Sequence, residues 1–294
     1  MRVFILGGTG SIGTGVVREL QNRGHDVTGL SRSVRADEAL TSQGINVVRG
    51  NIEDPESWMQ IASDHDALIH TASTFEDNMG AIDRKLTDVL MDAVSHRAES
   101  LRFIYTGGCW QYGETGDHVA TEETPFRPIG AFSWFTQVAK KLLSSQKLLT
   151  AIVHPAMVYH EDGGVFEDFI LAAKDGRPIE IWGSTETRWP IVERSDLARA
   201  YCDLLEDQQL CGHYNVTSQE GVYVRDIAQS VSNHFDQDFK YVTVDVDELI
   251  KRYGAWAFGP TIDQQMSADK LSKATDWSPR FLDFRKTPLF GFKS

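Results

Sequence analysis

The sequence predicts an α/β protein built on a doubly wound parallel sheet. Short apolar runs alternate along the chain with stretches of helical periodicity, and the first apolar run leads directly into a glycine-rich turn. Alternating strands and helices require crossover connections, which make the strands parallel and place helices on both faces of the sheet. Ligands of such sheets bind at the carboxyl ends of the strands. The residues that follow each strand are therefore the candidates for function.

The expected elements alternate regularly up to about Val158. Strands are expected at Val3–Leu6, Asp26–Leu30, Asn46–Val48, Ala67–His70, Phe103–Thr106 and Ala151–His154. Helices are expected near Ile12–Arg23, Ala36–Gln43, Pro55–Ser63, Ile82–His96 and Phe135–Gln146. Later in the chain, a helix is expected at Asp196–Glu206 with Ser195 or Asp196 as its N-cap, and a strand at Gly212–Val216.

A change of composition predicts a smaller second lobe. Segments 160–190 and 236–294 are richer in Trp, Phe, Pro and Gly than the rest of the chain. The expected division is a nucleotide-binding domain of residues 1–159 and 191–235 and a C-terminal substrate lobe of residues 160–190 and 236–294. Within that lobe, the acidic run Asp245–Glu248 is expected to begin a solvated helix, since acids are favoured at the positive end of the helix dipole.

Composition and charge exclude several classes of function. The 294 residues include 29 basic and 42 acidic side chains, for a net charge of -13. Such a surface repels phosphate backbones and anionic lipid, so neither nucleic acid nor a membrane is an expected partner. The apolar run Val3–Leu6 is too short for a signal peptide. The 3 cysteines have no metal-ligand spacing, so no metal is expected and the predicted compartment is the reducing cytoplasm.

Glycines follow the first expected strand at a spacing that suits a dinucleotide. Gly7, Gly10 and Gly13 form G-x-x-G-x-x-G where this strand meets the next helix. A tight turn requires glycine, and the close approach of a pyrophosphate leaves no room for a Cβ atom. The helix N-terminus then offers N–H groups to the phosphates. The predicted cofactor-binding residues here are Gly7, Thr9, Gly10, Ser11, Ile12 and Gly13; the competing interpretation is a tight turn without a ligand.

The end of the second expected strand favours NADP(H). A site specific for NAD carries Asp or Glu at this place, whereas this chain has Ser31 followed by Arg32. Arg32 could pair with the 2′-phosphate and Ser31 could donate a hydrogen bond to it, so NAD(H) is the less favoured cofactor. The competing interpretation of Arg32 is a solvated charge. Further cofactor contacts are expected after the third and fourth strands, at Asn51, Ile52, Thr71, Ala72 and Ser73.

The chain resembles the short-chain dehydrogenase/reductase superfamily, in its NAD-dependent epimerase/dehydratase-like branch. The matching segments are Gly7–Gly13, Gly50-Asn51, His70–Ser73, Ile104–Gly108 leading to Tyr112-Gly113, His154–Tyr159, and Trp189–Val192 leading to Asp196-Leu197-Ala198. The resemblance implies a Rossmann-type domain with a C-terminal substrate lobe, and it places the nicotinamide near Pro155, Ala156 and Val158. In this superfamily a helix equivalent to Ile82–His96 often pairs subunits; a homodimer is one expectation, and simple packing on the sheet is the other.

One part of the family pattern is missing. Enzymes of this superfamily usually carry Tyr-x-x-x-Lys together with a Ser or Thr, and this chain has no Tyr-x-x-x-Lys. The usual Ser position holds Gly108. By position, the predicted catalytic residues are Tyr112, Lys140 and Thr106; for Tyr112 the competing role is a core aromatic, and for Lys140 a solvated helix charge. Cys109 is interpreted as a small buried thiol.

The resemblance and the missing motif leave three functions open. The favoured one is an atypical NADP(H)-dependent reductase or dehydrogenase that acts on a small, fairly apolar carbonyl-type substrate. Aromatic residues expected to border the cleft support an apolar substrate. The alternatives are a non-catalytic NADP(H)-binding sensor or regulator and an NAD-dependent epimerase or dehydratase. The predicted substrate contacts are Trp110, Trp134, Tyr159 and Trp189, for which packing between the lobe and the sheet is the competing role.

Overall fold

The computed structural model describes residues 1–292, and its backbone contacts divide the chain into two compact units. The first unit contains residues 1–107, 134–153 and 197–214. The second contains residues 108–133 and 154–196 and the chain from 215 onward. The nucleotide-binding domain expected from the sequence included 108–133, 154–159, 191–196 and 215–235, so the two divisions differ in these segments.

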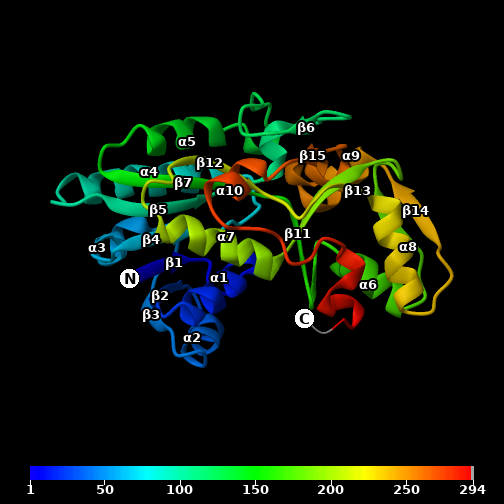
Figure 1. Cartoon of the computed structure of the whole chain (residues 1–294), viewed down its shortest axis with the longest axis horizontal. Helices are drawn as coiled ribbons and strands as arrows, with labels where there is room; N and C mark the ends of the chain where they lie inside the picture. The colour runs from blue at the N-terminus through cyan, green and yellow to red at the C-terminus, as the bar shows by residue number, and fades with distance from the viewer. Residues whose placement is uncertain (293–294) are drawn as a thin grey trace. The chain divides into compact units, whose positions relative to one another are not determined.

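The parallel sheet predicted from the alternation is present. It has 7 strands in the order β12-β7-β5-β4-β1-β2-β3 (Figure 1). Neighbouring strands from β7 to β3 all pair in parallel. The order reverses between β1 and β4, so the carboxyl ends of these two strands flank the position where such sheets bind ligands. The strands are β1 (Arg2–Leu6), β2 (Asp26–Ser31), β3 (Asn46–Arg49), β4 (Ala67–His70), β5 (Leu101–Thr106), β7 (Leu148–Pro155) and β12 (Gly212–Val216).

Helices cover both faces of this sheet. Figure 1 shows α4 and α5 on one side of it and α1 and α7 on the other. Their bounds are α1 (Ser11–Asn22), α2 (Val34–Thr41), α3 (Met59–Ser63), α4 (Met79–Ser95), α5 (Phe135–Leu143) and α7 (Arg194–Glu206). The single helix expected at Pro55–Ser63 is wrong: a 3-10 turn, Pro55–Ser57, precedes α3. Trp58 interrupts the helix with φ -136°, and its indole N–H donates to the backbone oxygen of Asn51 at 2.8 Å.

The predicted N-cap of α7 is also wrong. The helix begins at Arg194, before both Ser195 and Asp196. The Glu193 carboxylate accepts the backbone N–H of Ser195 at 2.6 Å. Asp196 is fully buried, and its carboxylate accepts the backbone N–H groups of Arg280 and Phe281 at 2.9 and 3.0 Å. The carboxylate of Asp196 therefore holds a distant segment of the second unit.

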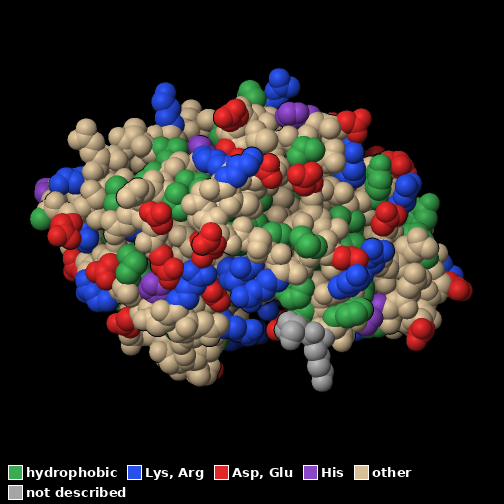
Figure 2. Space-filling model, in the orientation of Figure 1, with side chains coloured by type: hydrophobic (Ala, Val, Ile, Leu, Met, Phe, Trp, Pro, Cys, Tyr) green, Lys and Arg blue, Asp and Glu red, His purple; other side chains and the backbone are tan. Residues whose placement is uncertain are grey.

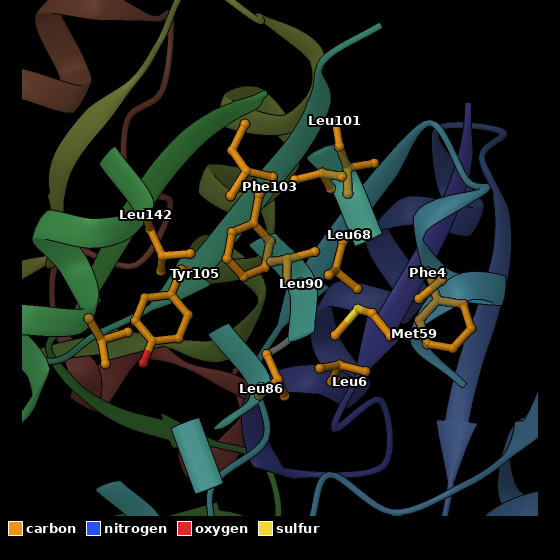
Figure 3. Packing of buried hydrophobic residues seen from close by; sticks show 14 of the residues in the cluster. Phe4, Leu6, Met59, Leu68, Leu86, Leu90, Leu101, Phe103, Tyr105 and Leu142 are labelled. Carbon is orange, nitrogen blue, oxygen red and sulfur yellow. The ribbon is translucent and has the colours of Figure 1, made fainter. Parts of the chain in front are cut away.

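Apolar side chains of β1 fill both faces of the sheet. Phe4 and Leu6 point to one face, Val3 and Ile5 to the other, and all four are fully buried. On the face of Phe4, the core contains side chains of β4, β5, α3, α4 and α5 (Figure 3). Burial on both faces explains the continuous apolar runs by which the strands were predicted. The labelled core residues are Phe4, Leu6, Met59, Leu68, Leu86, Leu90, Leu101, Phe103, Tyr105 and Leu142.

A buried arginine fixes the edge of the sheet formed by β7 and β12. Arg102 on β5 is fully buried. Its guanidinium donates to the backbone oxygens of Leu149 and Leu210 at 2.9 Å each, and also to that of Leu204. These carbonyls come from β7, from the end of α7 and from the turn before β12. One side chain thus ties together three segments of the first unit.

The second unit contains smaller sheets. A 4-stranded sheet has the order β13-β11-β8-β9, and two further pairs are β10-β14 and β15-β6. Asp245 caps α9 by accepting the Asp247 backbone N–H at 2.8 Å, so the acidic run does begin a helix, as expected. The strands are β6 (Val119–Ala120), β8 (Met157–His160), β9 (Gly163–Gly164), β10 (Ile179–Trp182), β11 (Arg188–Glu193), β13 (Gln219–Tyr223), β14 (Tyr241–Val244) and β15 (Gln265–Met266). The helices are α6 (Glu167–Lys174), α8 (Val224–His234), α9 (Val246–Tyr253) and α10 (Asp269–Ala274).

The surface carries charges of both signs. On the face drawn in Figure 2, acidic and basic side chains are interspersed. Among the described residues, no helix has both the length and the apolarity needed to cross a bilayer.

Candidate functional site

The turn between β1 and α1 requires its glycines. Gly7 has a φ of +81°, in the left-handed region that favours glycine. A Cβ on Gly7 would lie 2.7 Å from the backbone nitrogen of Ala72, at the end of β4. A Cβ on Gly13 would overlap the carbonyl oxygen of Gly7. The glycine pattern therefore reflects close packing of backbone on backbone.

The same turn has the features that a pyrophosphate needs. A Cβ on Gly10 would approach only the Gly7 oxygen, at 3.3 Å. Thr9, Gly10 and Ser11 are exposed, and the N-cap of α1 is Gly10, which has no side chain to cap the helix. The helix therefore presents backbone N–H groups and the positive end of its dipole at an open turn. These residues fit the diphosphate of a dinucleotide.

The end of β2 offers arginine rather than serine to a phosphate. Ser31 is 2% exposed, and its hydroxyl donates to the backbone oxygen of Ser33 at 3.1 Å. The Ser33 hydroxyl in turn accepts the backbone N–H of Ala36 and caps α2. Arg32 and Arg35 are exposed. The accessible cations at this turn are therefore arginines, while the hydroxyl of Ser31 is already hydrogen-bonded.

A small pocket brings together several predicted cofactor residues within the first unit. Ile52, Ala72 and Ser73 line it. Asn51 is absent from its lining; its side-chain oxygen accepts the backbone N–H of Glu53 at 3.2 Å. Thr71 lies at the adjacent end of β4 and donates from its hydroxyl to the backbone oxygen of Leu6 at 2.8 Å. The complete lining is Ile52, Ala72, Ser73, Thr74, Met79, Ile82 and Asp83.

A hydrogen-bonded group that was not predicted from the sequence lies beside this pocket. Asp83 on α4 bonds through one carboxylate oxygen to His70 Nε2 and through the other to the Tyr105 hydroxyl, at 2.9 Å each. Burial and the nearby charge of Asp83 raise the pKa of Tyr105 well above its usual value. The three residues come from β4, α4 and β5, and no sequence spacing links them.

The Thr106 hydroxyl is engaged in hydrogen bonds within the first unit. It donates to the backbone oxygen of His70 at 2.6 Å. Because its only proton is used there, the Tyr201 hydroxyl at 2.7 Å is the donor of the second bond. Thr106 thus lies at the end of β5, as expected, with its proton already bonded to protein.

The Tyr112 hydroxyl is likewise engaged, within the second unit. Tyr112 is 3% exposed and donates to the side-chain oxygen of Asn215 at 2.7 Å. Burial raises the pKa of Tyr112. Burial also raises the pKa of the Cys109 thiol to about 12, in agreement with its interpretation as a buried thiol. Among residues 1–292, no group of three or more His, Cys, Asp or Glu side chains is placed to hold a metal.

Two candidates on or beside α5 lie in the first unit. Lys140 is exposed in the last turn of α5. Trp134 packs on α4, since a Cβ on Gly80 would lie 2.5 Å from its ring. The roles of Lys140 in catalysis and of Trp134 in substrate binding stay predictions.

The other predicted substrate contacts are aromatic residues of the second unit. Trp110 stacks on Trp256 with ring centroids 6.3 Å apart. Trp189 stacks on Phe169 at 6.0 Å, and Tyr159, which is fully buried, stacks on Phe166 at 4.9 Å. Each ring has a packing role within the unit, and its contact with a substrate stays a prediction.

The predicted nicotinamide contacts follow or end β7. Pro155 is its last residue. The next residue, Ala156, donates its backbone N–H to the backbone oxygen of Val216 at 2.9 Å. The backbone oxygen of Val158 accepts the N–H of Val165 at 2.9 Å. These bonds fix the backbone of the segment, and its role at the cofactor stays a prediction.

Sequence comparison identifies a family and full-length relatives. A model of the NAD dependent epimerase/dehydratase family matches residues 3–217. An uncharacterized protein of Schizosaccharomyces pombe, C2A9.02, is 24% identical over 284 residues that cover 95% of both chains. The 2'-dehydrokanamycin reductase of Streptomyces kanamyceticus is 23% identical over 297 residues, covering 96% of this chain and 76% of the reductase.

Solved structures share the fold. The UDP-glucose 4-epimerase of Thermus thermophilus, solved in complex with NAD, has a TM-score of 0.81 at 19% identity and covers 99% of this chain and 97% of its own. The human epimerase family protein SDR39U1, solved with NADPH, has a TM-score of 0.76 at 20% identity and covers 96% of each chain.

Proposed function

This chain belongs to the NAD-dependent epimerase/dehydratase family, and on that premise we propose that it is an NADP(H)-dependent reductase of a small, fairly apolar carbonyl compound. Its fold is the NAD(P)-binding fold of that family. Bound NADPH would supply the hydride. The chain's own residues would hold the diphosphate at the turn from Gly7 to Gly13 and the 2′-phosphate at Arg32.

The residues at the end of β2 are the main support for NADP(H) as the cofactor. The NAD-specific pattern has a carboxylate there, and this chain instead has the buried Ser31 followed by the exposed Arg32. Arg35 is a second exposed cation in the first turn of α2, whose N-terminus favours anions. The turn therefore suits a phosphate better than a free ribose hydroxyl. A human relative in fold was solved with NADPH.

The missing Tyr-x-x-x-Lys favours net reduction over epimerisation. Epimerases need a strong base and retain their NAD through the reaction. The lysine predicted from sequence position, Lys140, is exposed in the last turn of α5. A relative named as a reductase aligns with 96% of the chain. A cofactor that is released after each turnover suits a reductase whose specificity is for NADP(H).

The proton needed at the carbonyl oxygen would come from a hydroxyl that changes its partner. Thr106 is bonded to the His70 oxygen and Tyr112 to Asn215. Either hydroxyl would have to leave that partner to donate to a substrate. Tyr112, the acid predicted from sequence, is the more deeply buried of the two.

Calorimetric titration with NADPH, NADP+, NADH and NAD+ tests the cofactor. We expect tight binding of the NADP forms, weakened about ten- to hundredfold in Arg32→Ala, because a hydrogen bond to a charged group contributes about 1.5–3 kcal/mol. Arg18→Ala, which removes an exposed arginine from α1, is the matched control and should leave binding unchanged. A preference for NAD(H), or an absence of binding, would contradict the proposal.

Turnover then separates the reductase from a second candidate, a non-catalytic NADP(H) sensor. The bonded hydroxyls of Thr106 and Tyr112 favour the sensor. Loss of NADPH absorbance with a member of a broad carbonyl, imine and enone panel supports the reductase. Unequal affinity for NADP+ and NADPH without turnover supports the sensor.

A further inference from the structure

Strand β14 leaves one edge of a two-stranded sheet open. It pairs in parallel with β10 and has no other neighbour among the described strands. The backbone N–H of Ile179 on β10 donates to the backbone oxygen of Lys240 at 2.8 Å, so residue 240 and every second residue after it face β10. The N–H and C=O groups of Tyr241 and Thr243 therefore point to the open edge. Figure 1 shows β14 at the outer margin of the second unit.

The side chains at this edge are uncharged and exposed. Tyr241 and Val242 are 48% and 47% exposed, and Thr243 is exposed as well. Edge strands usually carry charges or proline, which prevent pairing with another chain. The outer strand of the main sheet, β3, follows that rule, since its exposed residues are Asn46 and Arg49. The open edge of β14 instead presents residues that favour strand pairing.

The outward-facing residues of β14 are complementary to themselves. When two antiparallel strands meet about a two-fold axis, residues whose backbone groups face the edge must lie opposite each other. One such register opposes Tyr241 of each copy to Thr243 of the other, with two backbone hydrogen bonds in each pair. The same register places Val242 opposite Val242 of the second copy. Aromatic and β-branched side chains form favourable cross-strand pairs, so a second β14 fits this edge.

Charge favours the same arrangement. Lys240 is exposed and has no ion pair within residues 1–292. The acidic run Asp245–Glu248 directly follows the strand. An antiparallel pair brings the start of each strand beside the end of the other, so Lys240 of each copy lies near the acidic run of the second. The net charge of -13 opposes association of two copies in general, whereas opposite charges meet at this edge.

We propose that β14 pairs antiparallel with β14 of a second copy of this chain and joins two β10-β14 pairs into one four-stranded sheet. The inference concerns association and is independent of the proposed function. A strand of 4 residues makes a small interface, so we expect a weak dimer with a dissociation constant of about 10–100 µM. Helix α4, which contains most of the segment expected from the resemblance to pair subunits, takes no part in this contact.

Opposite charges at residue 242 test the pairing and its register. Sedimentation velocity from about 1 to 200 µM should show the wild-type protein passing from monomer to dimer. Val242→Lys and Val242→Glu should each stay monomeric, because like charges meet at the two-fold axis, and an equimolar mixture of the two should dimerise. Val34→Lys, at a side chain on α2 that is 63% exposed, is the matched control and should dimerise like the wild type. Circular dichroism spectra check that each variant is folded.

A cysteine at the two-fold axis gives a second measurement. The Cα atoms of the opposed residues 242 would lie about 4.5 Å apart, within the range that a disulfide spans. In a background where the exposed Cys211 is replaced by Ser, Val242→Cys should form a disulfide-linked dimer under mild oxidation. Thr243→Cys faces Tyr241 of the second copy and should form at least about tenfold less of it. Non-reducing electrophoresis measures both.

Each contrary outcome identifies what fails. A wild-type protein that stays monomeric at about 200 µM overturns the inference. Dimerisation that persists unchanged in Val242→Lys overturns it too, because association then uses another surface. A mixture of Val242→Lys and Val242→Glu that stays monomeric, or equal cross-linking through residues 242 and 243, overturns the antiparallel pairing. None of these results bears on the binding of NADP(H).

Discussion

Two glycine-bearing turns, one after β1 and one after β5, place glycine under different constraints. At Gly13, the space for a Cβ is already filled by the backbone oxygen of Gly7. At Gly108, φ is 166°, an extended conformation that any residue adopts, and no atom outside the adjoining residues lies within 4 Å of a Cβ. The first turn therefore requires its glycine, and the second does not.

The difference concerns the residue that the superfamily usually carries after the fifth strand. That residue is Ser, and Gly108 stands in its place. Because Gly108 has room for a side chain, packing does not account for the missing hydroxyl. The turn after β1 is fixed by backbone geometry, whereas the residue at 108 is open to selection for chemistry.

The largest effect is expected at the first turn. In Gly13→Ala, the added methyl overlaps backbone that cannot move without opening the turn. Helix propensity favours alanine by about 1 kcal/mol, and the overlap costs about 3 kcal/mol, so a net loss of about 2 kcal/mol is expected. Urea unfolding measures this loss, and calorimetry should show that NADP(H) binding is lost as well. Gly130→Ala, at an open position, is the control. If Gly13→Ala and Gly130→Ala are equally stable, the turn after β1 does not require glycine at position 13.

A moderate effect is expected in the loop that follows Gly108. Tyr112→Phe removes the hydroxyl that donates to the side-chain oxygen of Asn215, and Asn215 is fully buried. An unsatisfied buried acceptor costs about 1–3 kcal/mol, and urea unfolding measures the change. Tyr241→Phe, at a side chain that is 48% exposed, should be neutral. Unchanged stability with lost turnover would instead make Tyr112 the proton donor.

The smallest effect is expected at Gly108 itself. Gly108→Ser should change the free energy of unfolding by less than about 0.5 kcal/mol, because the position is open and extended. The difference in melting temperature between the variant and the wild-type protein measures this change in stability. A loss as large as that of Gly13→Ala would show that the two turns are equally constrained and would undo the comparison.

The fold was predictable where structure depends on local sequence. β1 and β4 were expected because their apolar runs are continuous and buried on both faces of the sheet. The turn from Gly7 to Gly13 was expected because backbone geometry there needs glycine. Both signals lie within a few residues of the feature they predict.

The hydrogen-bonded partners were not predictable in the same way. Asp83 lies 13 residues from His70 and 22 from Tyr105, and Tyr112 lies 103 residues from Asn215. Which hydroxyl is free and which is bonded depends on these pairings. The sequence could place Tyr112 and Thr106 at the end of β5, but it could not show that their protons are already engaged.

The buried Arg102 also bears on how the chain emerges from the ribosome. N-terminal segments fold first during synthesis. Until Val216 has emerged, β12 cannot cover β7, which remains an open edge that can pair with another chain. Over the same interval Arg102 lacks the carbonyls of Leu204 and Leu210. This sheet edge would therefore stay accessible to chaperones that bind nascent chains until the residues between β7 and β12, and β12 itself, have been synthesised.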